Sequence, residues 1–180
     1  MKVYLVNGTG GVGKSTFEKF VLQEVGNFGF QVSTVDFVKE VAKFCGWDGV
    51  KDAKNRKFLS DLKDLLTEWG DVPLREVNKA ITHELLVLEQ YGFDDKVATF
   101  FVDVREPSEL DKFKSFYNAK TILIRREVPQ LAIYNHADAD VENYEYDIYI
   151  DNNGDLEELR AKARQFVKDE DLFTGYKVKK

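Results

Sequence analysis

The chain contains little cysteine and no long apolar run, and both shortages exclude classes of protein. Cys45 is the single cysteine in 180 residues, so no disulfide can form among them, which fits a reducing compartment. Its apolar neighbours Val41, Ala42 and Phe44 favour a packed thiol over a reactive one. No apolar segment reaches the roughly 18 residues of a membrane-spanning helix, and no apolar leader precedes the first strand-like run. We expect a cytoplasmic protein with no membrane partner.

Metal-binding histidines and basic tracts are also scarce. His136 lies near Asp138 and Asp140, but one histidine and two aspartates in an aperiodic segment are weak evidence for a metal site. Lys and Arg number 26 against 32 Asp and Glu, which gives a net charge of −6. Nucleic-acid surfaces are rich in clustered Lys and Arg, so we expect no nucleic-acid partner. A small phosphorylated ligand stays compatible with this charge, because a few well-placed arginines can bind it.

A glycine-rich motif is present in full. Residues 8–15 read GTGGVGKS, match G-x-x-x-x-G-K-[ST], and lie between a strand-like run and a stretch with helical periodicity. Glycines let backbone N–H groups turn toward an anion, and the helix N-terminus adds partial positive charge. Lys14 can reach the β- and γ-phosphates, and the Ser15 hydroxyl can ligate Mg²⁺. We predict that ATP and Mg²⁺ bind through Gly8, Thr9, Gly10, Gly11, Val12, Gly13, Lys14, Ser15 and Thr16.

The rest of the chain alternates strand-like and helix-like segments. Strands are predicted over 2–7, 31–36, 97–104, 121–124 and 147–150. Helices are predicted over 15–28, 37–45, 58–69, 74–88, 107–117 and 156–167. This alternation indicates an α/β fold with a parallel sheet covered by helices on both faces, formed by one domain over 1–180. Ligands of such sheets bind at the carboxyl ends of the strands, so residues there are candidate site residues.

Two acidic residues are predicted at strand ends. Asp103 could hold Mg²⁺ or accept a hydrogen bond from the attacking group, and Arg105 could bind an acceptor phosphate. The alternative for Asp103 is an N-cap of the following helix. Asp36, predicted to end the second strand, could position the acceptor or contact the metal. The N-cap of the next helix is an equally good interpretation of Asp36.

Three further arginines and one turn are candidate binding or catalytic residues. Arg125 and Arg126 follow the fourth strand and could stabilise the transferred phosphoryl group, although a solvated pair beside Glu127 is the alternative. Arg56, in a polar stretch, could bind an acceptor phosphate or could lie on a solvated helix face. Asn153 and Gly154, after the last strand, could frame the nucleotide base, and an ordinary Asn-Gly turn is the other interpretation.

With these segments in place, the chain resembles the P-loop nucleoside monophosphate kinase superfamily, and more narrowly the bacteriophage-type deoxynucleoside monophosphate kinases. The shared features are the 8–15 loop, Val-Asp-Val-Arg at 102–105 and Tyr-Asp-Ile-Tyr-Ile-Asp-Asn-Asn-Gly at 146–154. The resemblance implies a P-loop NTPase fold with a five-stranded parallel sheet in the order 2-3-1-4-5. It also implies a helical insert of about 37–92 that closes over the acceptor, and a lid of about 125–144 over ATP. The lid has two arginines, and which one acts at the transition state stays open.

The function expected on this basis is ATP-dependent phosphoryl transfer to a small phosphorylated acceptor, most simply a (deoxy)nucleoside monophosphate. We expect a monomer or a homodimer. One alternative is a kinase for another small molecule. Another is a nucleotide-dependent switch or GTPase, but the Asn-Lys-x-Asp motif typical of guanine recognition is absent, since residues 78–81 read NKAI. A domain that binds nucleotide without catalysis is a third, which the intact Lys14, Ser15 and Asp103 disfavour.

Overall fold

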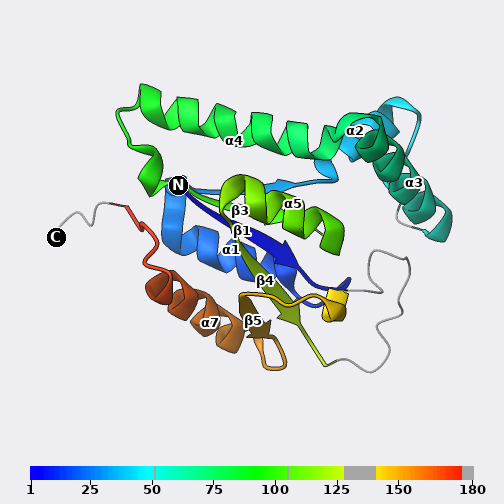
Figure 1. The fold of residues 1–180 in the computed structure, drawn as a ribbon. Coiled ribbons are helices and arrows are strands. Elements are labelled where there is room, and N and C mark those ends of the chain that lie inside the picture. The colour runs from blue at the N-terminus through cyan, green and yellow to red at the C-terminus, as the bar shows by residue number, and fades with distance from the viewer. Residues whose placement is uncertain (51, 105, 128–140, 176–180) are drawn as a thin grey trace.

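The computed structural model describes residues 1–50, 52–104, 106–127 and 141–175. Its centre is a five-stranded sheet in the order β2-β3-β1-β4-β5, and all four strand pairs are parallel (Figure 1). The predicted fold class and strand order are therefore confirmed. The strands are β1 (Lys2–Asn7), β2 (Gly29–Ser33), β3 (Thr99–Asp103), β4 (Lys120–Arg125) and β5 (Ile148–Asp151).

Helices cover both faces of the sheet. On one face α1 (Lys14–Val25) and α7 (Leu156–Asp169) lie together, and on the other lie α4 (Val72–Gln90) and α5 (Pro107–Tyr117). The central strand β1 serves both cores, because alternate side chains of a strand point to opposite faces. Val3 and Leu5 pack toward α4 and α5, whereas Tyr4 and Val6 pack toward α1 and α7. A strand buried on both faces explains the continuous apolar runs of the sequence.

Two further helices extend beyond the sheet. They are α2 (Asp36–Phe44) and α3 (Ala53–Gly70), which lie beside one end of α4 in Figure 1. Short 3₁₀ turns occur at η1 (Gly26–Phe28), η2 (Asp95–Val97) and η3 (Val141–Asn143). Of the predicted insert, α4 packs Val77, Ile81 and Leu88 against the sheet, so α2 and α3 are the part that projects. Residues 128–140 of the predicted lid lie outside the described residues.

The second strand ends earlier than predicted. It spans Gly29–Ser33, and Asp36 is the first residue of α2. The Asp36 carboxylate accepts the Ser33 N–H at 3.0 Å, and Thr34 donates its N–H and its hydroxyl to the Asp103 carbonyl, each at 3.2 Å. These bonds turn the chain out of the strand. The third strand is also shorter, because Val97 belongs to η2.

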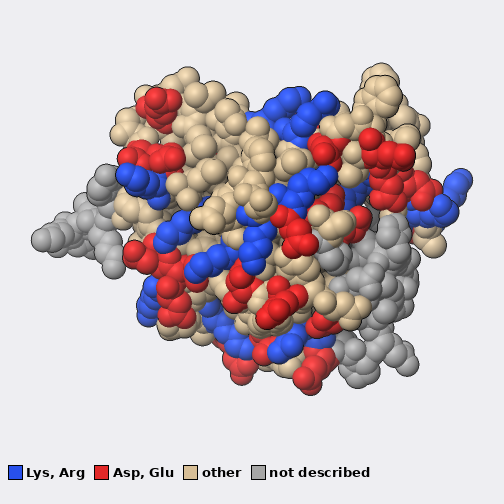
Figure 2. Space-filling view, viewed as in Figure 1, with Lys and Arg blue, Asp and Glu red and all other residues tan. Residues whose placement is uncertain are grey.

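Exposure of the projecting helices corrects the expectation of a packed Cys45. Cys45 is exposed instead of packed, because it follows the end of α2, where Phe44 is 95% exposed. The apolar stripe of α3 correctly predicts a helix but not a buried face, since Trp69 is 83% exposed. No helix among the described residues has both the length and the apolar character needed to cross a bilayer. On the face in Figure 2, basic and acidic side chains are interspersed over the described surface.

Candidate active site

The phosphate loop connects β1 to α1 and packs tightly against its surroundings. Gly8 has a φ of 143°, and a Cβ there would lie 2.2 Å from the Ile124 carbonyl oxygen. Gly13 has a φ of 99°, and a Cβ there would lie 2.3 Å from Nδ2 of Asn152. Both positions therefore exclude a side chain on conformational and on steric grounds. The sequence motif has the structural context that an anion-binding loop requires: a buried strand, a glycine turn and a helix N-terminus.

Lys14 and Ser15 open the helix that follows the loop. The Lys14 ammonium group donates to the Gly8 carbonyl and, at 3.0 Å, to the Thr9 carbonyl. The lysine thus lies folded along the loop, and a phosphate oxygen bound there would replace these carbonyls as acceptor. Lys14 and Ser15 line the same cavity as Gly10, Gly11, Gly13 and Thr16.

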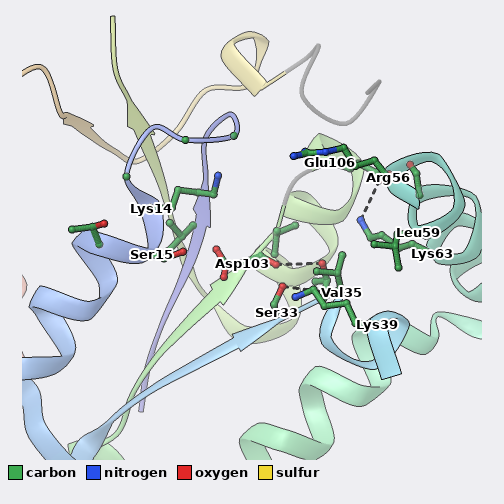
Figure 3. Close-up of a pocket in the computed structure, with 18 residues that line it drawn as sticks. Lys14, Ser15, Ser33, Val35, Lys39, Arg56, Leu59, Lys63, Asp103 and Glu106 are labelled. Carbon is green, nitrogen blue, oxygen red and sulfur yellow. Dashed lines mark hydrogen bonds and ion pairs between the residues drawn. The ribbon is translucent and has the colours of Figure 1, made fainter. Parts of the chain in front are cut away.

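This cavity has a volume of about 580 Å³, and three different parts of the chain form its walls. The phosphate loop forms the first wall, and the ends of β2 and β3 form the second with Ser33, Thr34, Asp103 and Val104. The third wall comes from the projecting helices and the start of α5. Figure 3 shows it opposite the loop, with Lys39, Arg56, Leu59, Lys63 and Glu106 facing the cavity across Asp103. The cavity joins an anion-binding loop to a set of cations on the far side.

Asp103 belongs to an acidic pair whose other member, Glu18, was not predicted from the sequence. Glu18, on α1, is fully buried, and its carboxyl group lies against that of Asp103. Burial is the main cause that raises the pKa of Glu18 to about 8, the Asp103 charge adds to it, and Lys14 acts in the opposite direction. The Gln31 amide bridges the pair, donating to Glu18 at 2.6 Å and to Asp103 at 3.2 Å. A glutamate within the apolar stripe of Phe17, Phe20 and Val21 is the signal that could have revealed it.

Lys63 is the second functional candidate missing from the sequence analysis. Its side chain is 6% exposed, and its ammonium group lies 3.1 Å from Glu106 and 2.5 Å from Glu109. Burial raises the pKa of Glu109, while the Lys63 charge lowers it. This triad fastens α3 to the start of α5. It brings the third wall of the cavity against the end of β3. On sequence alone, Lys63 was indistinguishable from the exposed lysines around it.

The structure brings together only part of the predicted set. The loop residues, Arg56 and Asp103 line one cavity. Asp36 does not: it caps the Ser33 N–H, pairs with Lys39 at 3.1 Å and lines a separate groove with Glu40 and Glu76. Asp36 is also not the N-cap of α2, because Val35 holds that position and Asp36 is the first residue of the helix. Arg105 lies outside the described residues.

The remaining predicted residues lie near the end of β4 and after β5. Arg125 pairs with Asp151, which raises the pKa of the guanidinium, and it stacks over the Tyr149 ring at 5.3 Å. Arg126 is exposed. The Asn153 side chain accepts the Glu127 N–H at 2.8 Å, and Gly154 packs against Glu158. None of these residues lines the cavity between the loop and α3, as far as the described residues form it.

Comparison with known proteins finds a distant likeness to solved structures, at low sequence identity. No protein-family model matches the sequence, and neither does any curated protein. A shikimate kinase from Bacteroides thetaiotaomicron is 13% identical, covers 95% of this chain and 99% of its own, and has a TM-score of 0.47. A sugar kinase from Janibacter sp. HTCC2649 is 14% identical, covers 93% of this chain and 95% of its own, and has a TM-score of 0.49. A shikimate kinase from Aquifex aeolicus is 12% identical, covers 96% of this chain and 99% of its own, and has a TM-score of 0.46. At these values the likeness says nothing of this chain's activity.

Proposed function

We propose that this protein transfers the γ-phosphoryl group of ATP to a small phosphorylated acceptor. We further propose that the acceptor is a (deoxy)nucleoside monophosphate, so that the products are ADP and the diphosphate. The observation that carries the proposal is the single cavity of about 580 Å³ that joins the phosphate loop to the cations of α2 and α3. Two anionic groups can enter such a cavity from opposite walls and meet near Asp103.

The donor half of the proposal rests on the loop. Its N–H groups and Lys14 would bind the phosphates of ATP, and Lys14 would follow the charge as the γ-phosphoryl group moves. Ser15 and Asp103 line the same cavity, and their hydroxyl and carboxylate oxygens are donors that suit Mg²⁺. Among the described residues, no group of three or more acidic, histidine or cysteine side chains could hold a metal. Ser15 and Asp103 would hold the ion together with phosphate oxygens and water, as is usual for Mg²⁺ at phosphate sites. Bound there, Mg²⁺ would neutralise phosphate charge.

The acceptor half rests on the opposite wall. Lys39 of α2 and Arg56 of α3 both line the cavity, and in Figure 3 they lie across Asp103 from Lys14. Arginine can bind a phosphate through two parallel hydrogen bonds, which fixes its orientation as well as its position. Catalysis would then consist mainly of holding donor and acceptor in line and stabilising the charge of the transferred group. The acceptor-binding roles of Arg105 and Asp36, and the lid roles of Arg125 and Arg126, stay predictions.

The test is ADP release from Mg²⁺-ATP against a panel of ribo- and deoxynucleoside monophosphates, with nucleosides and phosphomevalonate included. We expect one or two monophosphates to stimulate release strongly. Stimulation by an unphosphorylated compound would replace the acceptor class. A flat panel with tight ATP or GTP binding would contradict the nucleotide acceptor and favour either a different acceptor or the switch.

A matched pair of variants tests the assigned acceptor wall. Arg56→Gln removes a cation that lines the cavity, and Lys57→Gln removes its neighbour, which pairs with Asp61 at 2.6 Å on the exposed side of α3. We expect Arg56→Gln to raise the KM of the acceptor by about ten-fold or more, with the KM of ATP nearly unchanged. Lys57→Gln should alter neither. Equal increases in both KM values for Arg56→Gln would contradict its place on the acceptor side.

A further inference from the structure

The phosphate loop is held at both ends by buried side chains that the proposed mechanism does not use. At its start, the Asn7 side chain accepts the Gly8 N–H at 2.7 Å and donates to the Tyr146 hydroxyl at 2.9 Å. The Tyr146 hydroxyl in turn donates to the Val141 carbonyl at 3.0 Å. Asn7 and Val141 are fully buried, and Tyr146 is 4% exposed. Three hydrogen bonds therefore connect the first glycine of the loop to the residues that precede β5.

Chemistry fixes the direction of each of these bonds. The Gly8 N–H can only donate, so the Asn7 amide presents its oxygen to Gly8 and its NH₂ group to Tyr146. The phenol oxygen accepts that bond, and its own proton is left for the Val141 carbonyl. Each of the three side-chain groups thus has a defined donor or acceptor role in the network. Because it is buried, removal of the phenol oxygen takes one hydrogen-bond partner from the Asn7 amide and one from the Val141 carbonyl, with no water to replace it.

The other end of the loop is held by Asn152. This residue is 5% exposed, and its side-chain amide donates to the Val12 carbonyl at 2.8 Å. Its backbone N–H donates to the Arg125 carbonyl at 2.8 Å, which fixes it to the end of β4. In a trans peptide the carbonyl and the following N–H point in opposite directions. A Val12 carbonyl directed at Asn152 therefore turns the Gly13 N–H away from Asn152, and Gly13 lines the cavity.

We propose that Tyr146, acting through Asn7, and Asn152 are positioning residues that preset the phosphate loop in its nucleotide-binding shape. The inference rests on the proposed function and extends it, because it assigns a role in nucleotide affinity to side chains outside the cavity lining. A loop already held in the bound shape loses less conformational entropy when the phosphates arrive. Releasing either hold should therefore weaken nucleotide binding without changing the groups that contact the phosphates.

The test compares two tyrosine-to-phenylalanine variants. Tyr146→Phe removes the hydroxyl that holds Asn7. Tyr4→Phe is the matched control, because Tyr4 is also buried (2% exposed) and lies on β1, the strand that ends at Asn7. Its hydroxyl donates at 2.8 Å to Glu170, which follows α7 and is not part of the loop network. We expect Tyr146→Phe to raise the Kd of Mg²⁺-ATP by about ten-fold, measured by titration calorimetry, and Tyr4→Phe to change it less than about two-fold. Asn152→Ala should resemble Tyr146→Phe. The KM of the acceptor should stay unchanged in all three.

A measurement on the unmodified protein adds a second readout. Amide hydrogen exchange followed by NMR should find the Gly8 N–H protected in the nucleotide-free protein, because the buried Asn7 side chain accepts it. Equal Kd values for Tyr146→Phe and Tyr4→Phe would overturn the inference, and so would an unprotected Gly8 amide. If Tyr146→Phe does not fold, Asn152→Ala and the Gly8 amide decide the question. Failure of the unmodified protein to bind any nucleoside triphosphate would instead overturn the proposed function, and this inference with it.

Discussion

Glu18 and Lys63 are the residues whose surroundings differ most from what their sequence positions indicate. Both are charged, both lie in helices, and both are buried with specific partners: Glu18 with Asp103 and Gln31, and Lys63 with two glutamates. Sequence patterns assign a charged helix residue to the solvent side by default. Its burial depends on what another element presents to it, and local sequence does not specify that. The phosphate loop is the opposite case, because its residue types and spacing already encode its chemistry.

Glu18 should make the protein less stable as the pH rises. Its pKa is about 8 in the folded protein, against the ordinary glutamate value of 4.5 that applies to the unfolded chain. Between these two pH values the folded state keeps a proton that the unfolded state has lost. The contribution of this group to stability is therefore lost as the pH rises through that interval, by up to about 1.4 kcal/mol per pH unit. Glu18→Gln should remove this loss, and should unfold at higher urea concentration than the unmodified protein at about pH 8 but not at about pH 5.

The matched control is Glu40→Gln, on the exposed surface of α2. We expect its urea midpoint to follow that of the unmodified protein at both pH values. If the stability difference between Glu18→Gln and the unmodified protein does not change with pH, the raised pKa of Glu18 is wrong.

Lys14 is the residue on which transfer should depend most. Lys14→Ala removes the cation of the phosphate loop, and we expect kcat to fall by about 10³-fold, with the free energy of unfolding changed by no more than about 1 kcal/mol. Lys19→Ala, on the exposed side of the same helix, should keep full activity. ADP release and thermal unfolding of both variants provide the check, and near-normal turnover by Lys14→Ala would contradict the donor site.

Helices and strands are predicted well from periodicity, whereas the faces they bury are not. The stripe of α3 contains Leu65 and Trp69, which are exposed, while Lys63 on the other side of the helix is buried. The reason is that α3 extends beyond the sheet and packs through polar groups at the cavity wall. The early end of β2 has a similar cause, since Asp36 caps the chain by bonding the Ser33 N–H. Both features arise from contacts between elements, which hydrophobic spacing does not report.

The Lys63 triad should be the main attachment of α3 to α5. Lys63→Met leaves Glu106 and the buried Glu109 without their cation, and breaking a buried pair of this kind costs about 3 kcal/mol. Lys57→Met, which breaks the exposed pair with Asp61 on the same helix, should cost about 0.5 kcal/mol or less. Urea unfolding gives both values. The double variant Lys63→Met/Glu109→Gln should recover part of the loss, and equal losses for the two single variants would show that the triad does not fasten α3.

Some features of the whole chain follow from the sequence pattern alone, and others do not. Alternation of strands and helices indicated a parallel sheet, and the order 2-3-1-4-5 came from the resemblance to nucleoside monophosphate kinases, because periodicity carries no information on strand order. The rule that ligands of parallel sheets bind at the carboxyl ends of the strands correctly places the loop and Asp103 at one cavity. It could not place Arg125, which is held away by Asp151 and Tyr149. It also did not anticipate that α2 and α3 supply the opposite wall of the cavity.

We propose that the γ-phosphoryl group moves to a small phosphorylated acceptor, and its transfer can be followed directly. The most direct measurement follows the label from γ-³²P-ATP in a mixture of nucleoside monophosphates with Mg²⁺, with products separated by chromatography. We expect the label to appear in a nucleoside diphosphate, and we expect Lys14→Ala to abolish its appearance. Label found only in inorganic phosphate, whatever the acceptor, would contradict phosphoryl transfer and identify the protein as a hydrolase or switch.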